Sequence, residues 1–147
     1  MKTIYDKKVS NELLTRIQSI TASDKALWGK MDAFQMLRHC AMSEEMYLGK
    51  KNYKRLFIGR IFGKLALGRI LKNEDPMKQN NPTHPDFKIT GSGNFELERE
   101  KWIALLNQYE KFSNHSFVHP FFGAMNKEQI GYYVYKHTDH HLRQFNR

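Results

Sequence analysis

Residues 126–145 read NKEQIGYYVYKHTDHHLRQF, and the rest of the chain is organised around this segment. Some of its side chains recur at the spacing of one helix face, namely Ile130, Val134, His137, His141 and Phe145. A stripe with this spacing normally packs against the protein interior. Asn126 followed by Gln129 matches a capping box, which indicates where the helix begins. We therefore predict an amphipathic α-helix whose buried stripe contains two histidines.

The two histidines of this stripe, His137 and His141, are four residues apart. On a helix they lie about 40° apart around the axis and about 6 Å apart along it. A buried imidazole needs a hydrogen-bond partner or a metal ion, and this spacing is a known zinc-ligand spacing. The alternative is a pair of core or partly exposed histidines that hydrogen-bond to their neighbours. His140 lies about 60° from His137 on the other side, which makes it a weaker candidate.

Three further stretches have the periodicity of bundle helices. A first helix is expected to begin at Ser10, which can cap it. A second begins at Asp32, where Gln35 completes another capping box, and ends at Gly49. A later helix begins at Asn94. Its core face is predicted to contain Trp102, Leu105, Leu106, Tyr109 and Phe112. The sequence shows no segment with the alternation of a strand, so we predict an all-α, four-helix bundle.

The second helix adds a third histidine, because His39 falls on its inward stripe. His39, His137 and His141 are therefore the candidate metal ligands, and three histidines leave a fourth position open for water or substrate. Glu44, Glu45 and Glu98 could supply a base or a ligand, but exposed helix carboxylates are the favoured interpretation. Cys40 is interpreted as a packing residue. One residue among Asp139, Arg143 and Gln144 is a candidate for orienting a ligand imidazole.

A basic segment separates the second and third bundle helices. Residues 50–72 contain eight lysines and arginines and no acidic residue, although the whole chain has 24 basic and 15 acidic residues. An extra helix is expected over 52–71, and Gly59, Gly63 and Gly68 predict that it is broken or mobile. A long loop, 73–93, follows. The segment is interpreted as a solvated face over one end of the bundle, or as a site for an anionic membrane surface or acidic partner. Nucleic acid is disfavoured, because no binding motif accompanies the charge.

The 147 residues are expected to form one domain, 1–147. Cys40 is the single cysteine, so an internal disulfide is excluded. The sequence has neither a signal peptide pattern nor an apolar run long enough to span a bilayer. A cytoplasmic protein without a membrane span is the expectation from these features.

Three motifs carry a family resemblance: residues 28–39 (WGKMDAFQMLRH), 119–123 (HPFFG) and 137–144 (HTDHHLRQ). With the order of the helices, they resemble the DinB/YfiT-like superfamily of metal-binding four-helix bundles over nearly the whole chain. The resemblance implies an up-down-down-up bundle in which His39, His137 and His141 bind one divalent ion, zinc or nickel. Relatives of this architecture often form homodimers, and no feature of this sequence decides whether this chain does. Some relatives are transferases or isomerases that use low-molecular-weight thiols.

The leading hypothesis is therefore a cytoplasmic DinB-like metalloprotein that binds one divalent ion. Whether it is an enzyme is left open; as an enzyme it would be a metal-dependent transferase or hydrolase that acts on a small molecule, with a low-molecular-weight thiol as co-substrate of the transferase. The reaction would be attack by water or a thiol on an electrophilic centre. The alternative is an interaction module without enzymatic activity, whose working surface is the basic 50–72 segment.

Overall fold

The computed structural model describes residues 1–114 and 116–147. Its α-helices are α1 (Lys7–Gln18), α2 (Ala33–Tyr47), α3 (Phe57–Ile70), α4 (Phe95–Leu106) and α5 (Lys127–Gln144). Two short 3₁₀-helices, η1 (Pro85–Phe87) and η2 (Asn107–Lys111), accompany them. Two strands of two residues each, β1 (Val118–His119) and β2 (Gly123–Ala124), pair as an antiparallel hairpin. The hairpin was not predicted, because strands of two residues are too short to show an alternating pattern.

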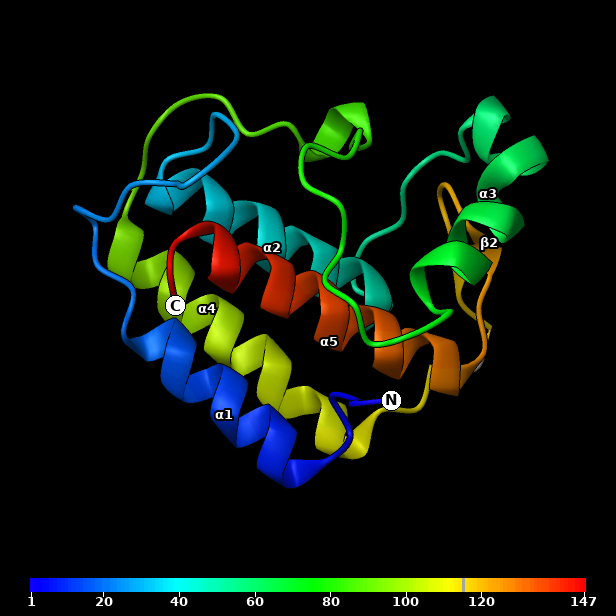
Figure 1. Ribbon diagram of the computed structural model, residues 1–147, viewed down its shortest axis with the longest axis horizontal. Helices are drawn as coiled ribbons and strands as arrows, with labels where there is room; N and C mark the ends of the chain where they lie inside the picture. Colours follow the sequence, from blue (N-terminus) through cyan, green and yellow to red (C-terminus); the bar gives the residue numbers. More distant parts are fainter. Residues whose placement is uncertain (115) are drawn as a thin grey trace.

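Four of these helices form the bundle that the sequence predicts (Figure 1). α2 packs against α4 and α5, and α1 packs against the same two helices from the other side. The core between them consists of fully buried side chains, among them Leu13, Ile17, Met36, Leu37, Trp102, Leu106, Ile130 and Val134. The extra helix α3 and the loop after it lie between α2 and α4 in sequence, as predicted.

Local capping explains where most bundle helices begin. Both predicted capping boxes are present, Asp32 with Gln35 on α2 and Asn126 with Gln129 on α5. Asn94 caps α4, again as predicted. The predicted start of α1 at Ser10 is wrong. The carboxylate of Asp6 accepts hydrogen bonds from the amides of residues 8 and 9, so the helix begins four residues earlier.

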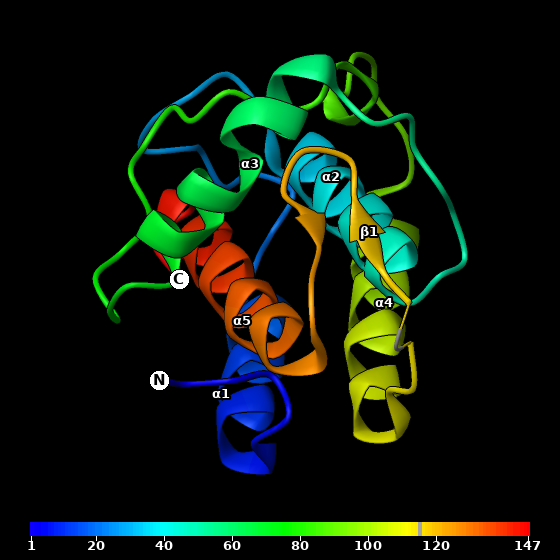
Figure 2. The same cartoon turned by 90° about the vertical axis from the view of Figure 1, so that its right-hand side faces the viewer.

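Helix α3 differs from the prediction in continuity and in extent, because it begins at Phe57 rather than at residue 52. It runs unbroken over 14 residues despite its three glycines. Its buried positions are Gly59, Gly63 and Leu67, and its largest apolar side chains face outward. Figure 2 shows the helix outside the bundle, next to the β1–β2 hairpin. None of the described helices is both long enough and apolar enough to cross a bilayer.

Candidate metal centre

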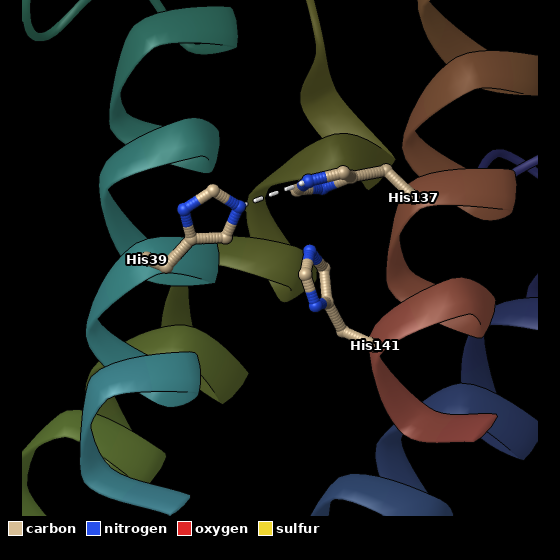
Figure 3. Close-up of side chains that lie close together, drawn as sticks. All are labelled: His39, His137 and His141. Carbon is tan, nitrogen blue, oxygen red and sulfur yellow. Dashed lines mark hydrogen bonds between the residues drawn. The ribbon is translucent and has the colours of Figure 1, made fainter. Parts of the chain in front are cut away.

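Three histidines from two helices converge between α2 and α5. His39 projects from α2 toward α5, and His137 and His141 project toward it from successive turns of α5 (Figure 3). Ligand-capable atoms of the three side chains all lie within 4.8 Å of one another. All three residues are buried, with 6–8% of their surface exposed. The structure thus brings together the three residues selected from the sequence.

Hydrogen bonds to Nδ1 hold two of the three rings. His39 Nδ1 lies 3.0 Å from the backbone oxygen of Phe87, an acceptor, so this nitrogen carries the proton. His141 Nδ1 lies 2.9 Å from Gln144 Oε1. The Gln144 amide is itself held, because its Nε2 donates to the Trp28 carbonyl at 2.8 Å. In neutral rings these bonds leave Nε2 of His39 and His141 unprotonated, with lone pairs available to a metal ion.

The third ring, His137, is held differently. Its Nε2 lies 3.3 Å from His39 Nε2, and its Nδ1 has no hydrogen-bond partner among the described residues. The ring stacks on Tyr133, with the ring centroids 5.8 Å apart and the planes 16° from parallel. Buried polar atoms without partners are rare in folded proteins. A cation bound by the three converging side chains is a physical reason for the close approach of their ligand atoms.

Burial also keeps the cluster neutral. Desolvation lowers the pKa of His39, His137 and His141, and for His137 the neighbouring histidines lower it further. An imidazole binds a metal ion only through an unprotonated nitrogen. At neutral pH all three rings are therefore in the form that binds a metal.

A cleft of about 340 Å³ opens onto the three histidines. Its walls include the aromatic side chains of Trp28, Phe87 and Tyr133. Lys30 and Lys88 also line it, and among the described residues no acidic side chain does. His140 lines the cleft too, with its ring 5.6 Å from that of Trp28, but it is not part of the three-histidine group. The cleft can therefore admit a small molecule, and its charge favours anionic groups.

The three glutamates predicted to be exposed are in fact buried, with at most 9% of their surface accessible. Glu44 accepts a hydrogen bond from the Tyr109 hydroxyl. Glu45 pairs with Lys51 at 3.0 Å and Lys101 at 2.7 Å, and Glu98 pairs with Arg38 at 3.0 Å. The prediction failed for Glu44 and Glu45 because α2 is covered by α4 on one side and α5 on the other, and for Glu98 because it lies on α4, which packs against α2. None of these carboxylates belongs to the three-histidine group.

The remaining candidates near the histidines have distinct roles. Gln144 orients His141, whereas Asp139 pairs with Arg16 at 2.8 Å and with Arg143 at 2.6 Å. Cys40 is fully buried against Met36, which agrees with a packing role. The Phe87 carbonyl was missed, and no sequence signal could have shown it, because every residue carries the same backbone group.

The chain belongs to the family described as "Protein of unknown function (DUF1569)", whose model matches residues 6–147. This family is in the DinB/YfiT-like clan, so the resemblance seen in the motifs is confirmed at that level. Comparison with curated proteins and with solved structures found no match.

Proposed function

We propose that this DUF1569 protein binds one divalent metal ion through His39, His137 and His141 and is a metal-dependent transferase or hydrolase. The observation that carries the proposal is the convergence of three buried, neutral imidazoles at the floor of a cleft. Such a nitrogen donor set suits zinc or nickel. Three protein ligands leave one position free, which is typical of catalytic rather than structural zinc sites.

When bound, the ion would supply Lewis-acid activation of a water molecule or a small thiol. The protein's own groups prepare the site. The Phe87 carbonyl and the Gln144 amide hold two imidazoles by their Nδ1–H groups, and Tyr133 covers the face of His137. Lys30 and Lys88 attract an anionic group of the substrate into the cleft.

A thiol-dependent transferase is favoured within this proposal. The volume of the cleft lies at the lower end of the range for small-molecule sites, which suits a small electrophile or thiol rather than a polymer. Resemblance to thiol-dependent relatives in the same clan adds support. Turnover with a low-molecular-weight thiol as co-substrate would distinguish a transferase from a hydrolase, which needs only water.

The first test is the metal content of gently purified, tag-free protein, measured by mass spectrometry. About one zinc or nickel per chain is expected for the natural sequence and almost none for His137→Ala or His141→Ala. His140→Ala is the matched control, since it removes a histidine from the same cleft but not from the group of three. A thermal melt adds a second readout. Metal at a thousand times its Kd should stabilise the natural chain by about 4 kcal/mol and His141→Ala far less.

Two results would contradict the proposal. One is the same metal content in His141→Ala as in the natural chain. The other is no metal in the natural chain after incubation with zinc and nickel at mildly alkaline pH, where imidazoles are unprotonated.

A further inference from the structure

We propose that α3 docks the protein on the surface of a bilayer containing anionic lipids. This inference goes beyond the metal site and does not depend on it. Five large apolar side chains of α3 face solvent: Phe57, Ile58, Ile61, Phe62 and Leu65, with 51–77% of each exposed. At 100° per residue they cover an arc of about 140° around the helix. A contiguous apolar face of this kind marks a binding surface.

Packing holds this face outward. On the opposite side of α3, a Cβ atom at Gly59 or Gly63 would collide with the backbone oxygen of Phe121. Only glycine lets the helix approach the backbone so closely. The start of the helix is tied by the Leu56 amide, which donates to the Pro120 carbonyl at 3.0 Å.

The other end of α3 is tied as well. The Lys136 ammonium donates to the Ile70 carbonyl at 2.7 Å and to the Asn73 carbonyl at 2.8 Å. Rotating α3 to bury its apolar side chains would break these contacts and place side chains where only glycines fit. The exposed face is therefore built into the fold.

Basic side chains surround the apolar face. Arg60 and Lys64 lie within about 60° of Phe57 around the axis, and Arg69 and Lys72 follow toward the C-terminal end. All four are exposed, and none is in an ion pair with a described residue. An apolar helix face bordered by lysine and arginine is typical of helices that lie in the interface of anionic membranes.

The positive charge of residues 50–72 and the position of α3 argue against other partners for its apolar face. A second copy of the chain would bring two segments together, each with eight basic residues and no acidic one, and they would repel. A helical peptide partner normally lies in a groove, whereas α3 stands outside the bundle as a ridge (Figure 2). A ridge can enter the headgroup region of a bilayer.

The test is co-sedimentation of the full chain with lipid vesicles. We expect binding to phosphatidylcholine vesicles that contain roughly 40 mol% phosphatidylglycerol, and much weaker binding to phosphatidylcholine alone. Ile61→Asp should lower the partition coefficient about tenfold or more, because it places a carboxylate in the inserted face. Leu97→Asp is the matched control. Leu97 on α4 is 60% exposed, as Ile61 is, and its substitution should leave partitioning unchanged.

The electrostatic part is tested with Arg60→Gln, which should weaken partitioning about fivefold. Added salt should weaken the binding of the natural chain. Circular dichroism shows that each variant remains folded, and Phe57→Ser tests the same face by a milder change. His141→Ala should bind vesicles like the natural chain, which separates this surface from the metal site.

Several outcomes would overturn the proposal. Equal binding by Ile61→Asp and the natural chain would mean that α3 does not insert. If the natural chain does not bind anionic vesicles, the lipid proposal is wrong, and an acidic protein becomes the favoured partner of the apolar face of α3. A dimer in lipid-free solution that Ile61→Asp dissociates, measured by analytical ultracentrifugation, would assign the face to a second copy.

Discussion

Helices α5 and α3 both depart from the usual amphipathic pattern, and they do so in opposite ways. α5 buries polar side chains, including His137, His141 and Gln144, whereas α3 exposes large apolar ones such as Phe57 and Ile61. The polar groups of α5 find most of their partners inside the chain, although His137 Nδ1 and Thr138 Oγ1 have none among the described residues. The apolar face of α3 has no such covering. Under the two proposals made above, the inversion on α5 would be satisfied by an ion and the inversion on α3 by a lipid surface.

The largest effect should come from substitution of Gln144, which tests whether the buried polar groups of α5 support a metal site. Gln144→Ala removes the acceptor that orients His141, so metal affinity should fall about tenfold to a hundredfold, equivalent to about 1.4 to 2.7 kcal/mol. Competition with a chelator measures it. Gln108→Ala truncates an exposed glutamine and is expected to keep full affinity. Unchanged affinity in Gln144→Ala would show that the hydrogen bond does not matter to the site.

A smaller effect is expected from the glycines of α3. Gly63→Ala should destabilise the metal-free protein by about 1 to 2 kcal/mol, because its methyl group would press on the backbone of residues 121 and 122. Gly68→Ala is the matched control. Nothing lies within 4 Å of the added methyl there, so helix propensity alone should stabilise the protein by up to about 1 kcal/mol. Urea unfolding of both variants gives the comparison. Stabilisation by both would mean that α3 can move away from the hairpin.

The smallest effect, when measured over the single pH unit between 7 and 8, concerns Glu44, a buried polar group away from the three histidines. Burial raises its pKa from 4.5 to about 8, so the native state holds a proton that the unfolded state releases above pH 4.5. Its contribution to stability is therefore full below pH 4.5 and is lost as the pH rises toward 8, by on the order of 1 kcal/mol per pH unit.

Measurement between pH 7 and 8 isolates this carboxyl group. The pKa values of His39, His137 and His141 are lowered below 6.5, so these residues are mostly neutral in both states in that window. Urea unfolding should show falling stability for the natural chain and a flatter profile for Glu44→Gln. Glu100→Gln, an exposed control on α4, should keep the natural slope. If the stability of Glu44→Gln still falls between pH 7 and 8 as that of the natural chain does, another group is responsible for the pH dependence.

The sequence predicted those parts of the fold that are set by local chemistry. The starts of α2, α4 and α5 follow from side chains that cap their own helices, and the bundle follows from periodic apolar stripes. The start of α1 was misplaced because residues 7 and 8 are both lysine and extend no apolar stripe. The orientation of α3 could not be predicted, since it depends on the backbone of residues 121 and 122, about 60 positions away.

The candidate site was likewise predicted where it depends on local helix geometry and missed where it depends on distant contacts. His39, His137 and His141 were selected because helical spacing fixes the direction of each side chain. The Phe87 carbonyl that holds His39 comes from η1, 48 positions away, and spacing says nothing about such contacts. The burial of Glu44 depends likewise on Tyr109, which lies 65 positions away. The direction of a side chain follows from the helix that carries it, but the group that the side chain contacts can lie far away in the sequence.

The sequence separation within the histidine cluster has a kinetic consequence. His137 and His141 share one helix, but His39 is 98 positions from His137, so the full cluster forms only when α2 and α5 have packed together. Interactions that form after the folding transition state slow unfolding and leave the folding rate nearly unchanged. Where α2 and α5 pack together only after the transition state, an ion held by all three histidines would lengthen the lifetime of the native state without accelerating its formation.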